Sequence, residues 1–394
     1  MNDRKCYTYW LCSLPGIGNR TIEKLLRKYQ TSQEIFKASE KELEQVLTKR
    51  QMESFRESRK KDSEEEIRRA YEALKHREIG FLTREDVNYP RRLQNIPDAP
   101  YGLFFKGSLP KEEQITVAMI GARECSEYGK YVAAELGRYL GSHGVQVISG
   151  MARGIDGISQ EAAIDAGGTS FGVLGCGVDI CYPAQNQKLY DQLLKRGGIL
   201  SAYPPGSLPG PRNFPPRNRI VSGLADAVIV IEARRKSGTL ITVDMALEQG
   251  RDVYVVPGRV TDRLSDGCNS LLKQGAEVFL SPEEFLRELQ ESQMRKQPQT
   301  RAGNLVQTTK FAKKEEGSEY GDKSKLKKEK DGGGLEPELK KVYDALDFYP
   351  QSMEEIASRL PGVYDIQILS TSLMLLCLKD AAVQVTPGYF CLKG

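Results

Sequence analysis

Two apolar segments near the middle of the chain each lead into a turn rich in glycine and arginine. The first begins at Ile115 and ends in Gly121-Ala122-Arg123, and the second ends in the turn over 149–154. Short β-branched runs of this kind are typical of parallel strands buried on both faces. Turns that follow parallel strands meet beyond the carboxyl ends of the strands, where backbone N–H groups and helix N-termini attract anions. The pattern predicts a phosphate-binding edge of a parallel sheet.

The same alternation of strand and helix continues to about Leu289, which predicts an α/β fold with a doubly wound parallel sheet. A chain of 394 residues is long enough for two or three domains. We expect four regions: an N-terminal helical domain over 1–80, the sheet domain over 81–290, a flexible charged linker over 291–334, and a winged helix over 335–394.

The predicted linker is rich in Lys, Glu, Gln, Ser and Gly, and it has too few large apolar groups to offset the entropy of the chain. A solvated tether is the preferred interpretation, and contact between its lysines and nucleic acid is the alternative. The segment 83–109 is expected to be extended and to lead into the sheet.

Bulk composition narrows the classes of function. The 57 basic residues nearly cancel the 53 acidic ones, so any basic surface must come from local clustering. The eight cysteines show no CxxC pair and no zinc-ligand spacing, and the polar N-terminus does not resemble a signal peptide. We therefore expect a cytoplasmic protein without metal or other cofactor. The two histidines, His76 and His143, lie outside the glycine-rich turns, which argues against a histidine-based hydrolase.

Basic side chains follow three of the predicted strands, at Arg123, Arg153 and Lys236. Ser237-Gly238-Thr239 opens a helix, so its N–H and hydroxyl groups are candidates for holding a phosphate. A Pro/Gly-rich loop adds Arg212 and, further on, the basic run 217–219. Together these positions predict a basic groove.

Phe214 lies within this basic loop. Sequence-tolerant binding of single strands needs a cationic groove and an aromatic face on which a base can stack, and Phe214 is the best candidate for that face. The alternative is that Phe214 anchors the loop in the core while Arg217 pairs with a carboxylate.

Acidic side chains near the groove are expected to play supporting roles. We predict that Asp156 caps the helix that follows it and orients Arg153. Glu232 is predicted to be a partner of Arg219, and Asp179 to cap a turn.

Five separated blocks resemble the DprA/Smf family of DNA-processing proteins. They are GAR at 121–123, SGMARGID at 149–156, GVLGCGVDICYPAQN at 172–186, FPPRNRIVSGLADAVIVIEA at 214–233 and KSGTLIT at 236–242. The resemblance implies an extended Rossmann-like domain that binds single-stranded DNA, forms a homodimer, and recruits and loads the RecA recombinase without catalytic turnover. It also implies protection of incoming single strands in natural transformation or recombination, with single-strand-binding protein as a further partner.

The basic turns and the resemblance together give the expected DNA-binding set. Its members are Gly121, Ala122, Arg123, Ser149, Gly150, Arg153, Gly154, Arg212, Phe214, Arg217, Asn218, Arg219, Lys236, Ser237, Gly238 and Thr239. The chain departs from the family pattern at Ala122, where serine is usual, and at Gln160, where histidine is common. Both departures leave the cationic pattern intact.

The flanking modules are less specific. The LPGIG segment resembles the hairpin of a helix-hairpin-helix unit, which makes Gly16, Gly18, Arg20 and Lys24 auxiliary candidates for DNA contact; a purely structural helical turn is the alternative. The presumed recognition helix of the winged helix, 365–379, contains no arginine. Because readers of the major groove need polar contacts to bases and phosphates, an interaction or dimer-support module is favoured there.

An enzyme is the main alternative class. Phosphoribohydrolases of the Lonely-Guy group carry a PGGxGTxxE block, but here Pro-Gly-Gly is absent before Gly238-Thr239, and Asp244 and Glu248 follow at the wrong spacing. A nicotinamide-dependent dehydrogenase lacks support, since no GxGxxG follows the first strand. A pure scaffold is the third possibility. Single-strand DNA binding without catalysis is the expected function.

Overall fold

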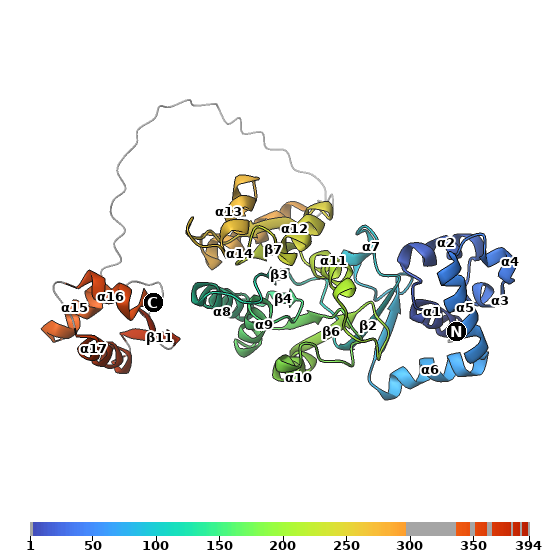
Figure 1. Cartoon of the computed structure of the whole chain (residues 1–394), viewed down its shortest axis with the longest axis horizontal. Helices are drawn as coiled ribbons and strands as arrows, with labels where there is room; N and C mark the ends of the chain where they lie inside the picture. The colour runs from blue at the N-terminus through green and yellow to red at the C-terminus, as the bar shows by residue number, and fades with distance from the viewer. Residues whose placement is uncertain are drawn as a thin grey trace, which may run out of the picture. The chain divides into compact units, whose positions relative to one another are not determined.

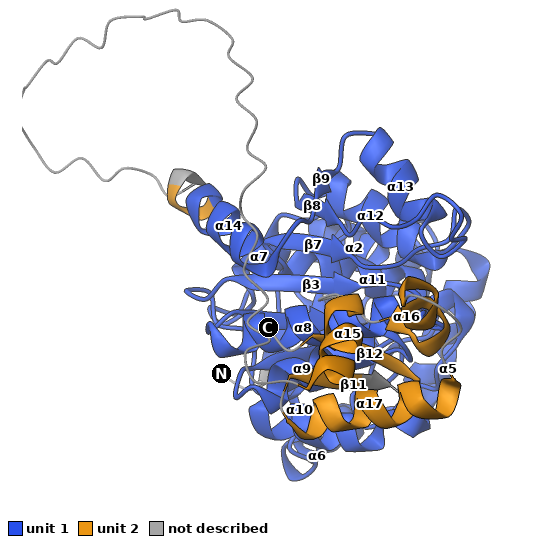
Figure 2. Cartoon of the chain, turned by 90° about the vertical axis from the view of Figure 1, so that its left-hand side faces the viewer, with its two compact units in different colours: residues 1–292 blue, residues 293–394 orange. Residues whose placement is uncertain are grey.

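The computed structural model describes residues 3–296, 336–346, 351–360, 365–379, 381–386 and 388–392. These residues fall into two compact units, 1–292 and 293–394, which Figure 2 colours separately. The first unit contains a nine-stranded sheet, and the second a three-stranded sheet. None of the helices in the described ranges has the length and apolar character that a membrane span requires.

The large sheet has the strand order β1-β2-β6-β5-β4-β3-β7-β8-β9. Its strands are β1 (Gly80–Thr83), β2 (Gly102–Gly107), β3 (Thr116–Ile120), β4 (Gln146–Ser149), β5 (Ser170–Val173), β6 (Gly197–Ser201), β7 (Ala227–Val230), β8 (Asp252–Val255) and β9 (Glu277–Val278). The strands from β6 to β9 in this order pair in parallel. The α/β, Rossmann-like character predicted from the sequence is confirmed. The antiparallel edge that β2 and β1 add beside β6 was not predicted.

The strand order reverses beside β3. The chain runs from β3 outward to β6 and then crosses back, so that β7 pairs with the free side of β3. In open α/β sheets, a crevice for ligands forms outside the carboxyl ends of the strands at such a reversal. The turns that follow β3, β4 and β7 therefore meet at one edge of the sheet.

Helices cover both faces of the large sheet (Figure 1). One face packs against α8 (Glu127–Ser142), α9 (Ile155–Asp165) and α14 (Pro282–Lys296), and the other against α11 (Phe214–Leu224), α12 (Gly238–Glu248) and α13 (Asp266–Lys273). Successive strand residues point to opposite faces, so Val117 and Met119 of β3 enter the first core, and Ala118 and Ile120 enter the second. Burial on both faces explains why these strands read as continuous apolar runs.

The N-terminal helices form a core of their own around Trp10 and Phe55. They are α1 (Asp3–Ser13), α2 (Asn19–Tyr29), α3 (Ser32–Lys37), α4 (Glu40–Leu43), α5 (Lys49–Lys61) and α6 (Glu64–His76). An ion pair of 2.7 Å between Lys5 Nζ and Asp86 Oδ1 ties them to the segment after β1. These helices therefore belong to the same compact unit as the sheet.

Two further α-helices, α7 (Arg91–Gln94) and α10 (Gln187–Arg196), belong to this unit. The segment 83–109, expected to be extended, contains α7 between β1 and β2. α10 precedes β6 and packs on the strands beside it. Helix α14 continues to Lys296, so the first six residues of the predicted linker 291–334 are helical. Residues 297–334 of that linker lie outside the described residues.

The described residues of the second unit from 336 onward form three helices and three short strands around one apolar core. They are α15 (Pro337–Ala345), β10 (Gln351–Ser352), α16 (Met353–Arg359), α17 (Ile366–Leu378), β11 (Ala382–Thr386) and β12 (Tyr389–Leu392), with the sheet order β10-β12-β11. The three helices and the terminal hairpin appear where the sequence places them. The assignment of this unit as a winged helix stays a prediction.

Candidate nucleic-acid interface

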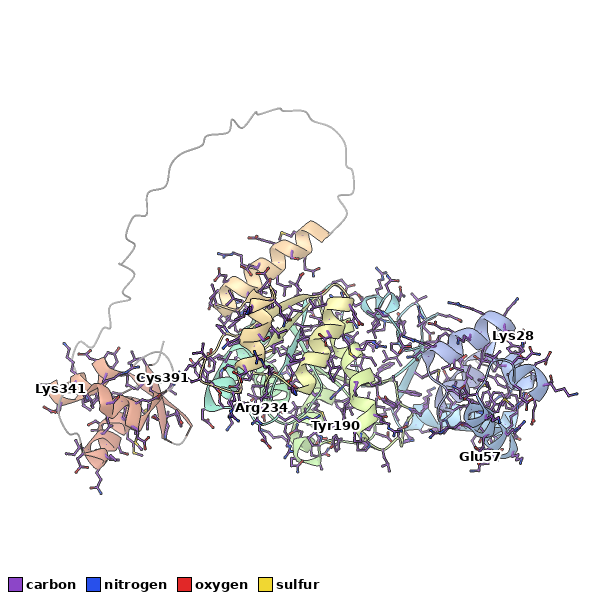
Figure 3. The ribbon with its side chains drawn as sticks, turned by 45° about the horizontal axis from the view of Figure 1, so that its top comes forward. Lys28, Glu57, Tyr190, Arg234, Lys341 and Cys391 are labelled. Carbon is purple, nitrogen blue, oxygen red and sulfur yellow. The ribbon has the colours of Figure 1, made fainter. Side chains whose placement is uncertain are left out.

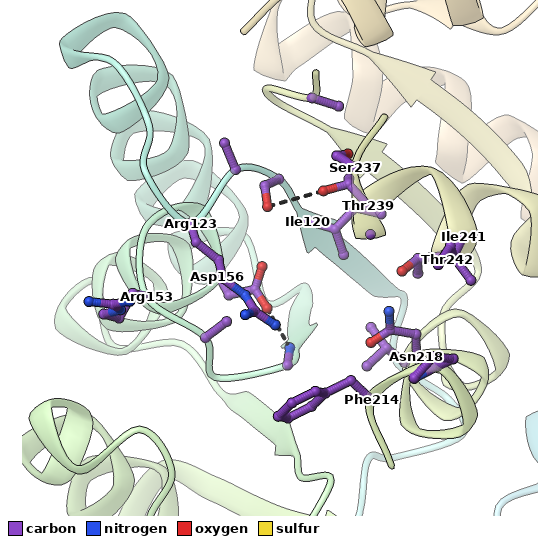
Figure 4. Close-up of a pocket in the computed structure, with 18 of the residues that line it drawn as sticks. Ile120, Arg123, Arg153, Asp156, Phe214, Asn218, Ser237, Thr239, Ile241 and Thr242 are labelled. Carbon is purple, nitrogen blue, oxygen red and sulfur yellow. Dashed lines mark hydrogen bonds between the residues drawn. The ribbon is translucent and has the colours of Figure 1, made fainter. Parts of the chain in front are cut away.

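A cavity of about 600 Å³ lies at the carboxyl ends of β3, β4 and β7, where the strand order reverses (Figure 4). Its lining includes four arginines and two carboxylates, Arg123, Arg153, Arg217, Arg234, Glu124 and Asp156. A second cavity of about 400 Å³ shares Arg123, Arg153 and Phe214 with the first. The two cavities are therefore adjacent, and we call them together the strand-end groove.

The turn after β3 forms one wall of the groove. Gly121 packs so closely on α9 that an added Cβ would lie 2.6 Å from Ile155 Cγ1. This close approach carries the chain directly to Arg123, which is exposed. The Arg123 guanidinium carbon lies 5.4 Å from the centre of the Phe214 ring, which is within the range of a cation–π contact.

The turn after β4 is held in a conformation that ordinary residues rarely adopt. Met151 has a φ of 54° and Gly154 a φ of 75°. A Cβ on Gly154 would lie 2.3 Å from the carbonyl oxygen of Ala122, so glycine is needed for the turns after β3 and β4 to touch. Arg153 leaves this turn and is exposed at the groove.

Arg217 and Asp156 lie beneath this turn. Arg217 is 5% exposed, and its Nη1 donates to the carbonyl oxygens of Gly150 and Val173. Asp156 Oδ2 accepts a 3.1 Å hydrogen bond from the Gly150 N–H. Burial raises the pKa of Asp156, and the charge of Arg217 opposes that rise. The pair therefore fixes the turn from below, while Arg217 also lines the groove.

The turn after β7 closes the third side. Ser237 is the N-cap of α12, whose first turn contains no acidic residue. Thr239 Oγ1 donates to the carbonyl oxygen of Gly121 at 3.3 Å, which ties this turn to the turn after β3. The Ser237 hydroxyl is buried and has no hydrogen-bond partner. The start of α12 thus offers an unsatisfied hydroxyl and free backbone N–H groups to an anion.

Three exposed arginines from three different turns remain without a carboxylate. Within the described ranges, no ion pair involves Arg123, Arg153 or Arg234. Arg234, labelled in Figure 3, is exposed, and Arg123 and Arg153 line the same cavity (Figure 4). Arg219, by contrast, is paired with Asp98 at 2.7 Å. The lining of the larger cavity therefore carries a net positive charge, with four arginines against Glu124 and Asp156.

An aromatic pair lies beside these cations. The rings of Phe214 and Tyr182 are 5.8 Å apart with an interplanar angle of 24°. Phe214 is half-buried and Tyr182 is 41% exposed. The sequence predicted Phe214 for this role, but it missed Tyr182. The signal was present in the family-like block 172–186, where Tyr182 is an aromatic residue in a loop after a strand.

Several predicted contacts lie away from the groove or serve it indirectly. Arg219 was predicted to contact DNA, but it points from α11 toward Asp98. Its neighbour Asn218 lines the groove, and successive residues of a helix are rotated by about 100°, so Arg219 faces away from the groove. The Ser149 hydroxyl is buried and donates to the carbonyl oxygen of Met119 at 2.6 Å. Arg212 and Lys236 are exposed but do not line either cavity.

The predicted roles of Asp156 and Glu232 are wrong. The N-cap of α9 is Gly154, and Asp156 bonds the Gly150 N–H instead of orienting Arg153. Glu232 accepts hydrogen bonds from the N–H and hydroxyl of Ser126, the N-cap of α8, and not from an arginine. Burial raises the pKa of Glu232, and these bonds oppose the rise.

Two smaller predictions concern single side chains. Asp179 was expected to cap a turn; its Oδ1 accepts from the Gly206 N–H, 27 positions along the chain, at 2.9 Å, and its carboxylate also pairs with Arg77. Gln160, which stands where the family commonly has histidine, is buried. Its Oε1 accepts from the Met151 N–H at 3.2 Å. Gln160 thus bonds the turn after β4 from within the core and does not line either cavity.

A family model described as DNA recombination-mediator protein A matches residues 80–290 of the chain, the part that builds the groove. The chain belongs to this family. It is 42% identical over 205 residues to the DNA processing protein DprA of Streptococcus pneumoniae, a match covering 52% of this chain and 72% of that protein. It is 38% identical over 224 residues to DNA processing protein DprA of Bacillus subtilis, covering 57% of this chain and 75% of that protein. The match to Protein Smf of Synechocystis, 41% over 213 residues, covers 54% of that protein.

A solved structure supports the same assignment. The X-ray structure of DprA from Streptococcus pneumoniae superposes with a TM-score of 0.63 at 33% identity, covering 72% of this chain and 97% of that chain. This chain is therefore a DNA-processing protein of recombination, built on a Rossmann-like α/β fold.

Proposed function

We propose that the strand-end groove binds single-stranded DNA. The phosphodiester backbone lies against Arg123, Arg153 and Arg234, and a base stacks on Phe214 and Tyr182. The observation that carries the proposal is the meeting of three exposed, unpaired arginines from three separate strand-end turns. Uncompensated cations around a cavity raise the local concentration of anions, and helix N-termini add N–H donors for phosphate.

The aromatic pair favours an unpaired strand over a duplex. Bases in a duplex stack on one another, whereas a single strand can place a base on an aromatic ring, a contact worth about 1–3 kcal/mol per base. The two adjacent cavities, of about 600 and 400 Å³, are lined by residues from Ser237 at α12 to Tyr182. We infer that the groove holds a segment of a strand, with little dependence on its sequence.

The binding function is proposed to be non-enzymatic. The carboxylates that a phosphoribohydrolase would use do not face the groove: Glu232 bonds Ser126, and Glu248 is exposed on α12 without lining either cavity. Incubation with nucleoside monophosphates is expected to release no free base. Steady release that depends on Glu232 or Glu248 would favour an enzyme.

We further infer, from the family to which the chain belongs, that the bound strand is protected and passed to the RecA recombinase by a homodimer. Natural transformation and recombination are the settings proposed for this step, with single-strand-binding protein as a further partner. A mixture of this protein, RecA and DNA covered with single-strand-binding protein tests it. Faster filament formation with this protein than without it is expected, and an unchanged rate would contradict the inference.

The N-terminal hairpin is proposed as an auxiliary contact with the DNA backbone. Gly16 has a φ of 77°, and Gly18 is the N-cap of α2 without a side-chain cap. Arg20, 83% exposed at its side chain and with its Nε 3.9 Å from Asp98 Oδ1, and Lys24 follow on the first turns of α2. Cations and free N–H groups together favour phosphate.

Fluorescence anisotropy with a labelled oligothymidylate tests the groove. We expect Arg123→Ala to weaken binding about tenfold, because charge-assisted hydrogen bonds contribute about 1.5–3 kcal/mol. Arg196→Ala is a matched control, since Arg196 is an exposed arginine in the last turn of α10, before the start of β6 and so at the opposite edge of the sheet. Equal loss of affinity in both variants, or in neither, would contradict the proposed site.

A further inference from the structure

Helix α17 of the second unit has two apolar faces. One face is buried in the core of the unit and comprises Leu369, Leu373 and Leu376. The other exposes Ile368, Leu375 and Leu378, whose exposed fractions are 58, 41 and 83%. The other two helices of the unit, α15 and α16, instead begin with acidic first turns. An exposed apolar face on a short helix of a small unit marks a surface that contacts another molecule.

The exposed face has the spacing of a coiled-coil seam. Positions 368, 371, 375 and 378 are separated by three, four and three residues, which matches the a and d positions of a heptad repeat. Thr371, which is exposed, satisfies its hydroxyl within the helix by donating to the carbonyl oxygen of Gln367 at 2.8 Å. Met374, 55% exposed, flanks the seam.

The charges at the two ends of α17 indicate the partner. Between Asp365 and Lys379 the helix contains no charged residue, so it offers nothing to a nucleic-acid backbone. The four seam positions are symmetric about position 373. In an antiparallel pair of α17 helices, Ile368 of one copy lies opposite Leu378 of the other, and Asp365 lies near Lys379 of the other. A parallel pair would set like charges together.

We propose that α17 packs antiparallel against α17 of a second copy of this chain. The contact is isologous, because the same surface serves both copies around a twofold axis. The seam spans about three helical turns. Such a short contact gains strength when the two copies are already joined elsewhere, since the second association is then intramolecular. The homodimer proposed above provides that setting, and the α17 contact does not depend on DNA binding.

Disulfide cross-linking of the full-length protein without DNA tests the pairing. A chain carrying Thr371→Cys is mixed with a chain carrying Leu375→Cys, because these positions face each other in the antiparallel register. We expect the oxidised mixture to give several-fold more covalent dimer than either variant alone or the native chain, whose eight cysteines are free and set the background. No excess in the mixture would overturn the proposal, as would equal cross-linking by Thr371→Cys alone.

A second variant separates the seam from a general loss of solubility or folding. Leu378→Glu, added to both chains, is expected to reduce the cross-link to background. Val383→Glu is the matched control, since Val383 is 41% exposed on β11 and lies outside the seam. Circular dichroism checks that both variants fold. Loss of the cross-link in both folded variants, or in neither, would overturn the assignment of the seam.

Charge reversal tests the orientation. Lys379→Glu is expected to slow cross-linking about threefold or more, because exposed ion pairs are weak and the twofold axis creates two of them. Asp365→Ser removes the partner charge but keeps a capping side chain at the start of α17. In a chain with that substitution, Lys379→Glu is expected to leave the rate of cross-linking unchanged. If Lys379→Glu slows cross-linking by the same factor in the Asp365→Ser chain as in the chain that keeps Asp365, the antiparallel register is overturned.

Discussion

Arg217 is the side chain whose replacement best separates support of the groove from contact with DNA. It is 5% exposed, and its guanidinium donates to two carbonyl oxygens and faces the buried Asp156. Arg217→Met keeps most of the side-chain volume but leaves Asp156 and both carbonyl groups without that partner. Leaving a buried acceptor without its hydrogen-bond partner costs about 1–3 kcal/mol, and here two carbonyl oxygens and a nearby buried carboxylate lose the guanidinium. We expect chemical denaturation at pH 7 to show a loss of that size.

The same variant should depend on pH in a defined direction. Burial raises the pKa of Asp156 in the folded state. The neutral carboxyl therefore contributes stability below the pKa of the unfolded state, about 3.9. That stability is lost as the pH rises through the pKa of the folded state. Arg217 lowers that pKa, so the loss of unfolding free energy at neutral pH is larger in the variant without Arg217. The difference in unfolding free energy between native chain and variant should therefore shrink as the pH falls toward 4.

Asp156→Asn provides the control for this reasoning. In that background no buried carboxylate remains, so Arg217→Met should destabilise less than it does in the native chain. Equal destabilisation in both backgrounds, or a loss that does not vary with pH, would refute the pairing of Arg217 with Asp156.

Three further outcomes follow from the geometry. Gly154→Ala should lower the melting temperature and weaken DNA binding, because its Cβ would lie 2.3 Å from the Ala122 carbonyl oxygen at a φ of 75°; native melting and affinity would contradict this. Arg219→Ala should leave affinity for single strands unchanged and cost about 1 kcal/mol of stability, since Arg219 pairs with Asp98 outside the groove; a tenfold loss of affinity by anisotropy would restore it as a contact. Tyr182→Ala should weaken binding by about 1–3 kcal/mol with native melting, and unchanged affinity would remove it from the groove.

The backbone of the site could be predicted from the sequence, because each wall of the groove is a local strand–turn–helix unit. Arg123 and Gly150 follow their strands directly, so the strand pattern alone places both at the sheet edge. The parallel order of the strands then brings these turns together, as the family blocks also indicated.

Long-range pairing between side chains was not readable in the same way. Glu232 was assigned to an arginine on charge alone, yet it bonds Ser126, more than a hundred positions away. Arg219 was assigned to DNA, yet Asp98 from the loop before β2 reaches it. Tyr182 was not predicted, because its stacking face forms only together with Phe214, which comes from a separate loop. Such contacts depend on how segments far apart in the sequence pack together, and the hydrophobic periodicity of a strand or helix does not predict them.

The position of the bound strand tests the central claim most directly. An oligonucleotide containing 5-bromodeoxyuridine, irradiated in complex with the full-length protein, transfers a covalent mark to side chains next to its bases. Mass spectrometry should find that mark on Tyr182 or Phe214. Marks confined to the N-terminal helices or to the second unit would contradict the strand-end groove as the binding site.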